Sequence, residues 1–302
     1  MASDMQEVPR TVELSSGQVM PTIGLGTDKL IDESKHPQVF YEAITEGGYR
    51  LLDCAKIYTN EALVGQAISR VVSEGEVARE DLFVITKLWM DDFADPEAAL
   101  RTSLAKLQVA YVDCYMIHWP AAFFQDDPAN RVPMHALWPK LESLVDQGLC
   151  KSIGVSNFSL QMLADLLCYC RVKPVLNEVE LNPTNTQAEL VRFMLAQRIV
   201  PVGYIPVCRP GDPRTEQVWS DENLGRICAA KGKSRAQVML NWAVARRTVP
   251  IPRSGSLLHQ KENIDIYDFT LSQEEMAQID TLDRGFRICD KRAHTKDYNF
   301  FC

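Results

Sequence analysis

The sequence has few of the features that mark membrane, secreted or nucleic-acid-binding proteins. None of its apolar runs approaches the ~18 residues that a membrane helix needs. Its first residues are polar and lack the apolar segment of a secretory signal. Basic residues number 32 against 40 acidic ones, and the net charge of -8 argues against a polyanionic partner. We therefore expect a cytoplasmic protein that binds neither membrane nor nucleic acid.

Three further patterns are missing. The nine cysteines include no C-x-x-C pair, and an odd number in a protein without a signal favours reduced thiols over a disulfide framework. No glycine-rich G-x-G-x-x-G turn joins a strand to a helix, so the dinucleotide loop of the Rossmann fold is absent. No low-complexity linker divides the chain, and we expect residues 1–302 to form a single domain.

What the sequence does contain is a repeated alternation of short apolar runs and helical patterns. Near-continuous apolar runs are typical of parallel strands buried on both faces, and eight occur, at residues 22–27, 51–55, 82–89, 112–119, 152–157, 175–180, 199–206 and 248–253. Apolar residues three or four apart predict helices between them, most clearly at residues 61–72, 95–107, 136–148 and 234–247. Eight such units predict an α/β fold, a (β/α)8 TIM barrel.

Helix ends and loops fit this prediction. Asp95 before Pro96 resembles an N-cap, Ser234 and Gln237 resemble a capping box, and Gly148 is placed to end a helix. Residues 11–21 read as an N-terminal β-hairpin. Residues 121–134 and 207–224 follow strand ends, so we expect substrate loops at the C-terminal face of the barrel, with the aperiodic tail 289–302 covering the same face.

Polar residues at the ends of apolar strands are the candidates for catalysis in such a barrel. Asp53, Lys87 and His118 each end an apolar run, and Tyr58 follows Asp53 closely. Taken singly, each also has a purely structural interpretation: the lysine as a salt bridge at the barrel rim, the histidine as a hydrogen-bonded structural residue and the tyrosine as a packing residue. Taken together at one barrel mouth, they suit carbonyl reduction, which needs a proton donor for the developing alkoxide.

Each of the four has a role in that chemistry. A Tyr58 hydroxyl can donate the proton, and an ammonium at Lys87 is expected to lower its pKa from the ordinary ~10. A carboxylate at Asp53 keeps the lysine charged and oriented, while His118 can hydrogen-bond the carbonyl oxygen.

Several motifs in order along the chain resemble those of the aldo-keto reductase family, near the aldose reductase branch. They are GYRLLDCAKIYTNEALVGQAI, FVITKLW, DCYMIHWP, KSIGVSNF, VGYIP and IPRS with KENIDIYDF, spread between about Val12 and Phe286. The resemblance implies a (β/α)8 barrel that binds NADP(H) in extended form and needs no metal. It also implies a catalytic tetrad of Asp53, Tyr58, Lys87 and His118, with Tyr58 as proton donor.

The resemblance also implies a cofactor site and a substrate pocket. Ser156 and Asn157 match residues that hold the nicotinamide carboxamide, Tyr204 matches the aromatic ring that stacks on the nicotinamide, and Arg253, Ser254 and Ser256 match the pocket of the adenosine 2′-phosphate. The remaining expected cofactor contacts are Gly26, Thr27, Glu178, His259, Glu262 and Asn263. The expected substrate pocket is lined by Asp28, Trp89, Trp119, Phe123 and Phe124.

The sequence departs from the family pattern at several of these positions. Asp28 replaces the usual pocket tryptophan, and its side chain either makes the pocket more polar or turns outward. Glu178 replaces a Gln that faces the carboxamide, and an ionised Glu can only accept hydrogen bonds. Arg253 replaces a Lys and keeps its charge, whereas His259 replaces an Arg at the 2′-phosphate. Residues 205–212 (IPVCRPGD) replace the common SPLG pattern after the stacking tyrosine.

The sequence therefore predicts an NADPH-preferring reductase, with NADH still open, acting on aldoses, small aldehydes or ketones. We expect it to be a monomer that also oxidises the corresponding alcohol. Two alternatives remain: a family member that binds cofactor without catalysis, as a structural or channel subunit, and a barrel lyase that forms a Schiff base on Lys87.

Overall fold

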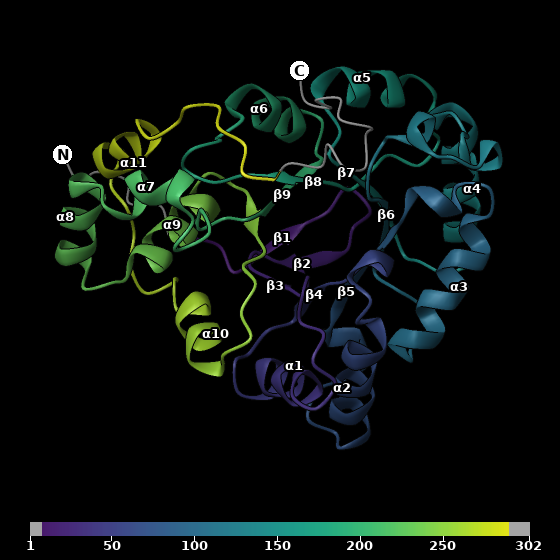
Figure 1. Ribbon diagram of the computed structural model, residues 1–302, viewed down its shortest axis with the longest axis horizontal. Helices are drawn as coiled ribbons and strands as arrows, with labels where there is room; N and C mark the ends of the chain where they lie inside the picture. Colours follow the sequence, from purple (N-terminus) through teal and green to yellow (C-terminus); the bar gives the residue numbers. More distant parts are fainter. Residues whose placement is uncertain (1–7, 290–302) are drawn as a thin grey trace.

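The computed structural model describes residues 8–289. Helices surround a central group of strands on all sides (Figure 1). Eight parallel strands follow one another in chain order around one sheet. They are β3 (Leu25–Gly26), β4 (Leu51–Asp53), β5 (Phe83–Leu88), β6 (Cys114–Ile117), β7 (Ile153–Ser156), β8 (Leu176–Glu180), β9 (Val200–Tyr204) and β10 (Val249–Pro250). Each lies within one of the eight apolar runs, which confirms the predicted barrel.

The first and last strands meet and close the sheet. The amide of Gly24 donates to the carbonyl of Pro250 at 3.0 Å, and that of Gly26 donates to Pro252 at 3.1 Å. Gly26 also forms a parallel bridge with Arg253. A Cβ on Gly26 would lie 2.8 Å from the carbonyl oxygen of Ile251, so the close approach of the two strands requires glycine here.

Eleven α-helices occur within residues 8–289. They are α1 (His36–Thr45), α2 (Glu61–Ser73), α3 (Pro96–Leu107), α4 (Met134–Asp146), α5 (Leu160–Tyr169), α6 (Ala188–Ala196), α7 (Glu216–Trp219), α8 (Glu222–Lys231), α9 (Arg235–Ala245), α10 (Leu257–Ile264) and α11 (Gln273–Asp280). The expected helix ends are confirmed: Asp95 caps α3, Ser234 and Gln237 form a capping box on α9, and Gly148 has a φ of 73° just after α4.

One predicted loop is partly helical. Residues 207–224 contain α7 and the start of α8, where the Asp221 side chain accepts a hydrogen bond from the Leu224 amide. Alternating charges and few apolar residues hide these turns in the sequence. The other loop, residues 121–134, contains only two short 3-10 turns, at Ala122–Phe124 and Pro128–Asn130.

The antiparallel hairpin of β1 (Thr11–Glu13) and β2 (Val19–Pro21) closes the amino end of the barrel. Leu14 and Met20 are fully buried and pack with inward-facing strand residues such as Leu51 and Phe83. The Gln18 side chain donates to the Asp113 carbonyl at 3.2 Å, which ties the hairpin to the start of β6. The predicted hairpin is thus confirmed, and the barrel opens at the carboxyl ends of its strands.

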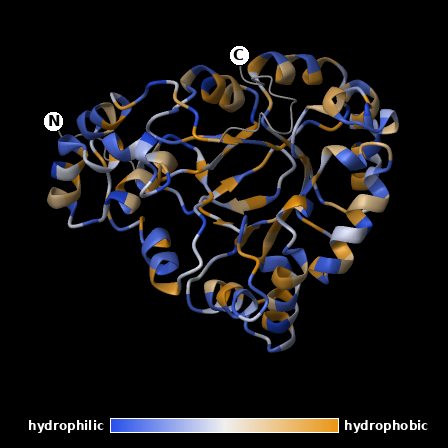
Figure 2. Cartoon of the chain, in the orientation of Figure 1, coloured by the Kyte–Doolittle hydropathy of each residue, from blue (hydrophilic) through white to orange (hydrophobic). Residues whose placement is uncertain are grey.

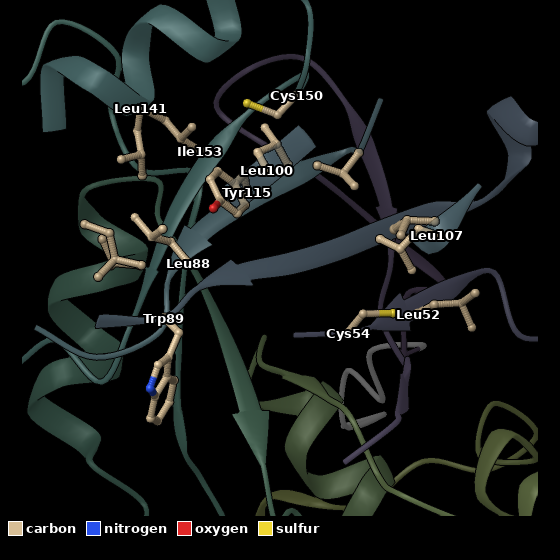
Figure 3. Close-up of a cluster of buried hydrophobic side chains, with 14 of the residues drawn as sticks. Leu52, Cys54, Leu88, Trp89, Leu100, Leu107, Tyr115, Leu141, Cys150 and Ile153 are labelled. Atoms are coloured by element: carbon tan, nitrogen blue, oxygen red, sulfur yellow. The ribbon is translucent and has the colours of Figure 1, made fainter. Parts of the chain in front are cut away.

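A second and larger apolar layer lies between the outer face of the barrel and the helices. Figure 3 shows part of it, including Leu100, Leu107, Tyr115, Leu141 and Ile153. The strands are mostly hydrophobic, while the surrounding helices combine hydrophobic and hydrophilic residues (Figure 2). This pattern fits amphipathic helices that cover a sheet buried on both faces.

Two further observations bear on the sequence predictions. No helix in residues 8–289 is both long and apolar enough to cross a membrane. The eight cysteines of the same range are free thiols. The tail predicted to cover the barrel mouth, residues 289–302, lies outside the described residues except for Cys289. The division into one domain over residues 1–302 stays a prediction.

Candidate functional site

The inward-facing positions of the strands change from apolar to polar as each strand approaches the barrel mouth. Side chains alternate between the two faces of a strand, so residues two apart point the same way. On β4, Leu51 is followed by Asp53, and on β5, Ile85 is followed by Lys87. Met116 on β6 is likewise followed by His118. The fold therefore brings these predicted residues to one end of one cavity.

Lys87 is at the centre of the resulting cluster. Its side chain is fully buried, and its Nζ forms a short ion pair with Asp53. It also donates to the Tyr58 hydroxyl at 3.1 Å and to the Cys54 carbonyl at 3.2 Å. Tyr58 reaches this position from the single 3-10 turn Lys56–Tyr58 that follows β4. Three of the four expected tetrad residues are thus in direct contact.

Glu178 on β8 adds a second carboxyl to the same lysine. Its Oε2 lies 3.4 Å from Lys87 Nζ, and its side chain is only 2% exposed. The Asp53 and Glu178 carboxyls thus share one ammonium, and each shifts the pKa of the other. Oε2 itself has no hydrogen-bond partner among the described residues.

Burial and mutual repulsion set the charges of this cluster. Burial raises the pKa of Asp53, although the Lys87 ammonium opposes the shift. Burial and the Asp53 charge raise the pKa of Glu178 to about 8, again against Lys87. Burial alone would lower the pKa of Lys87, but the two carboxyls outweigh it and hold that pKa well above its ordinary value. The lysine is therefore charged, as predicted.

The expected lowering of the Tyr58 pKa is wrong. Burial raises the pKa of Tyr58 well above its ordinary value, and the Asp53 and Glu178 charges add to this effect. Lys87 acts in the predicted direction but only offsets part of the shift. Sequence reasoning considered the ammonium and omitted the desolvation of a buried phenol. The hydroxyl consequently keeps its proton, which a proton donor requires.

His118 and Trp89 border the cluster on the side of the mouth. The Tyr58 and His118 rings meet edge to face with their centroids 5.7 Å apart, and the Trp89 and His118 rings do so at 5.1 Å. His118 is 7% exposed and Trp89 is 6% exposed. The structure thus brings all four tetrad residues together, with one predicted pocket tryptophan beside them.

Ser156, Asn157 and Tyr204 form a hydrogen-bonded row next to the tetrad. The Asn157 side-chain amide donates to the His118 carbonyl and to Ser156 Oγ, both at 3.0 Å. Its oxygen accepts from the Tyr204 hydroxyl at 2.8 Å. Ser156 Oγ donates to the Glu178 carbonyl at 2.8 Å. Asn157 has a φ of 63°, a left-handed conformation that Asn tolerates better than most residues.

The β3 end of the mouth contains three predicted contacts. Thr27 Oγ1 donates to the Asp53 carbonyl at 2.8 Å, which fixes the strand beneath the tetrad. Gly26 is at the closure of the barrel. Asp28 is partly exposed, its carbonyl accepts from Arg253 at 3.4 Å, and its charge acts on Asp53. A tryptophan-sized wall is therefore replaced by an anionic side chain near the cluster.

A group of cationic and amide donors lies on the other side of β3. Arg253 and His259 are exposed, and Ser256 is the N-cap residue of α10, so the positive end of that helix points to the same place. Ser254 Oγ accepts from the Ser256 amide at 3.2 Å, which orders the turn. Glu262 and the buried Asn263 follow on the second turn of α10.

The remaining pocket residues are spread more widely. Trp119 is 3% exposed and packs in the outer apolar layer, whereas Phe123 is 76% exposed. Phe124 contacts Phe123 edge to face, with ring centroids 5.6 Å apart. Of the predicted substrate residues, Trp89 is thus in direct contact with the tetrad, and Phe123 lies on the outer loop.

Sequence reasoning missed Glu180. This residue is fully buried two positions after Glu178, and it accepts hydrogen bonds from the amides of Ile288 and Cys289, both at 2.6 Å. It thereby fastens residues 288–289 against β8. The alternation that places Glu178 inside the barrel also places Glu180 there, so the signal was present in the VLNEVE run.

The site is thus a closed parallel barrel with a Tyr–Lys–Asp cluster, in which Lys87 and Asp53 are buried, and a histidine at its mouth. Residues 22–284 match the family model described as the aldo/keto reductase family. The chain belongs to the aldo/keto reductase family, near its aldose reductase branch.

Individual relatives agree over nearly the whole length. The chain is 37% identical to aldo-keto reductase family 1 member A1-A of Danio rerio, over 92% of this chain and 91% of the relative. It is 37% identical to an aldose reductase of Encephalitozoon cuniculi, over 93% of this chain and 96% of that protein. The crystal structure of a Bombyx mori aldo-keto reductase in complex with NADP superimposes with a TM-score of 0.85 at 33% identity, covering 97% of this chain and 98% of the other.

Proposed function

We propose that this protein is an NADPH-dependent reductase of aldoses, small aldehydes or ketones, with Tyr58 as the proton donor. The observation that carries the proposal is the contact of the buried Lys87 ammonium with both the Tyr58 hydroxyl, at 3.1 Å, and Asp53. A protonated phenol fixed by a buried ammonium, beside a histidine, is what reduction of a carbonyl requires.

The donor groups of the chain suit a dinucleotide phosphate. Arg253 and the N-terminus of α10 offer a cation and backbone amides to a phosphate, as anion sites at helix ends commonly do. Near the tetrad, the buried Glu178 Oε2 lacks a hydrogen-bond partner among the described residues, which leaves it available to a carboxamide N–H. The NADP complex of the Bombyx mori relative supports the same cofactor.

The residues of the chain have separate roles in the proposed reaction. The nicotinamide cofactor, when bound, supplies the hydride. His118 orients the carbonyl oxygen, the Tyr58 hydroxyl gives that oxygen its proton, and Lys87 stabilises the tyrosinate that remains. Asp53 holds Lys87 charged and in place. Trp89 shields one side of this cavity from water.

The substrate class follows from the mouth of the barrel. Asp28 contributes an anionic edge, and Trp89 contributes an aromatic wall. A polar edge together with an aromatic wall suits a polyhydroxylated chain better than a purely aromatic aldehyde, which supports aldoses and other small polar carbonyl compounds.

The test combines a substrate panel with one substitution. Tyr58→Phe should reduce kcat by more than tenfold for every aldose, aldehyde and ketone that wild type reduces with NADPH, while the Kd for NADPH stays nearly constant. A variant that kept more than about a tenth of the wild-type kcat, a loss of under ~1.4 kcal/mol, would exclude Tyr58 as the essential acid. A wild type that binds NADPH and reduces nothing on the panel would instead be a non-catalytic family member.

A further inference from the structure

Lys87 is the one ammonium beside two buried carboxyls, and a charged cofactor would change the balance of charge between them. Asp53, Glu178 and Lys87 are each at most 3% exposed at the side chain, so water screens none of them. One ammonium balances one carboxylate, and a second buried carboxylate would be left without a counter-charge. Such a group is expensive to ionise in a low-dielectric cavity.

The geometry indicates how the protein avoids this cost. Asp53 and Glu178 both lie on Lys87, and a proton on one of the two carboxyls leaves a single carboxylate for the single ammonium. Asp53 makes the short contact with Lys87, whereas Glu178 Oε2 is farther away at 3.4 Å. The proton therefore resides on Glu178 near neutral pH.

The charge balance differs between the two forms of the cofactor, and here the inference rests on the proposed function. The dihydronicotinamide ring is neutral, and the oxidised ring carries one positive charge. Hydride transfer to a carbonyl beside Tyr58 requires that ring to lie in this cavity. We propose that Glu178 recognises the redox state of the bound nicotinamide: its carboxyl keeps its proton while the ring is reduced and releases it to solvent when the ring is oxidised and cationic.

Several other titratable groups lie around the cluster of Asp53, Lys87 and Glu178 and must be separated from Glu178 in any test. They belong to each neighbouring element of the barrel mouth: Asp28, Asp53, Tyr58, Lys87, Cys114, His118, Glu180 and Tyr204. Lys87 and Asp53 form a fixed pair, and the thiol and phenols are held neutral by burial. His118 and Glu180 are the remaining candidates that a Glu178 substitution leaves in place.

The sign of the effect follows from proton linkage. The pKa of Glu178 is about 8 without cofactor. A cationic ring lowers that pKa, so binding of NADP+ expels a proton in the window between the lowered pKa and about pH 8. NADP+ affinity should rise with pH through this window and level off above it. A neutral reduced ring leaves the proton in place.

The experiment measures the ratio of two dissociation constants. The Kd values of NADP+ and NADPH are obtained by fluorescence titration of the whole protein at pH 6.5, 7.5 and 8.5. NADP+ and NADPH have the same 2′-phosphate end, so contributions from that end of the cofactor cancel in the ratio. We expect Kd(NADP+)/Kd(NADPH) to fall about three- to tenfold from pH 6.5 to 8.5 in wild type.

Two variants test whether Glu178 causes this pH dependence of the ratio. Glu178→Gln keeps the shape, cannot ionise, and should make the ratio independent of pH. Glu180→Gln removes the other buried acid on the same face of β8 and should keep the wild-type dependence. Calorimetry of wild type in two buffers of different ionisation enthalpy should also show proton release with NADP+ and none with NADPH, whether or not Glu178→Gln folds.

The outcomes separate this inference from the proposed function. A flat ratio in wild type, or a dependence that survives in Glu178→Gln, would overturn the role of Glu178 while both cofactors still bind. If neither cofactor binds wild type, the proposed function itself is wrong. Equal proton release with both cofactors would also contradict the inference, since it would trace to the phosphate end.

Discussion

At the scale of single residues, the site depends on how one buried ammonium is shared. Lys87 touches Asp53, Tyr58 and Glu178 at once, and each contact has a different consequence. The contact with Asp53 holds the lysine charged, the contact with Tyr58 partly offsets the burial of the phenol, and the contact with Glu178 brings a second carboxyl to the same ammonium at 3.4 Å. The reactivity of Tyr58 is therefore a balance between desolvation and this single cation.

Removing the cation should shift that balance in a measurable direction. In the oxidation of an alcohol, Tyr58 must accept a proton, so the rate rises with pH as the phenol ionises. Lys87→Met removes the only group that lowers the Tyr58 pKa among its main causes, and the rise should move to higher pH with a large loss of kcat. Steady-state oxidation rates against pH measure this shift.

The control is an exposed lysine that also pairs with a buried acid. Lys151 pairs with Asp113, whose side chain is nearly buried. Lys151→Met should change the stability of that pair and leave the pH profile of oxidation unaltered. An active Lys87→Met variant with the wild-type profile would contradict the role assigned to the ammonium.

At the scale of elements, the strands and the tetrad were predictable and much of the helical shell was not. Asp53, Lys87 and His118 stand at the ends of apolar runs, so their convergence follows from parallel alignment alone. The contact of Glu178 with Lys87 joins β8 to β5, which are not adjacent strands. No local sequence pattern predicts a side-chain contact between strands that are not neighbours. The sequence likewise predicts an ammonium near Tyr58, but it does not reveal the burial, whose effect on the pKa of Tyr58 is larger.

The sequence analysis predicts no helix at α8 or α11, and both have weak local signals for a physical reason. α8 (ENLGRICAAK) and α11 (QEEMAQID) are polar, and only Leu224, Ile227 and Ile279 are buried on them. α8 packs on α9, α11 packs on α8, and Ser272 forms a capping box at the start of α11. Tertiary contacts override weak propensity in such segments.

Helix α10 carries a prediction about cofactor choice. His259 is exposed in its first turn near Arg253, where an arginine would carry charge at all working pH values. An imidazole is a far weaker base than a guanidinium, so a histidine offers less positive charge than an arginine as the pH rises. His259→Arg should therefore strengthen NADPH binding more at pH 8 than at pH 6, by up to about 1–2 kcal/mol.

Fluorescence titration at both pH values measures this gain, and NADH is the matched control because it lacks the 2′-phosphate. The phosphate's own second pKa of ~6 affects both variants equally. A gain that is the same at the two pH values, or that NADH shares, would mean that residue 259 does not contact the phosphate.

Strand β8 carries a prediction about the segment that follows Arg287. Glu180→Ala would leave the amides of Ile288 and Cys289 without their acceptor, at a cost of about 1–3 kcal/mol to the local structure. Hydrogen exchange at these two amides should become faster by at least tenfold. Glu180→Gln retains one acceptor oxygen and should fall between wild type and Glu180→Ala. Unchanged exchange in the alanine variant would show that other contacts hold the segment.

At the scale of the whole molecule, stability depends on the closure between β3 and β10. An added Cβ at Gly26 would meet the backbone oxygen of Ile251 at 2.8 Å, and a backbone atom cannot move aside as a side chain can. Gly26→Ala should therefore lower the free energy of unfolding by about 1–3 kcal/mol, as overpacking does. Denaturant unfolding followed by circular dichroism measures the change.

Gly225 on α8 is the matched control, since a Cβ there would meet only the guanidinium end of the Arg235 side chain at 2.9 Å. Gly225→Ala should be neutral or slightly stabilising because alanine favours a helix. If both variants lost the same stability, the closure of the barrel would not be the cause.

The same closure has a consequence for synthesis on the ribosome. Gly26 and Arg253 belong to opposite ends of the described chain, so the final strand pairing must wait until nearly all of it has left the exit tunnel. Asp53, Lys87 and His118 emerge well before that moment, whereas Arg253 and the start of α10 emerge with the last strand. A nascent chain thus contains the proposed proton-transfer residues long before the proposed phosphate-binding end, so on this proposal cofactor stabilises the fold only at the close of translation.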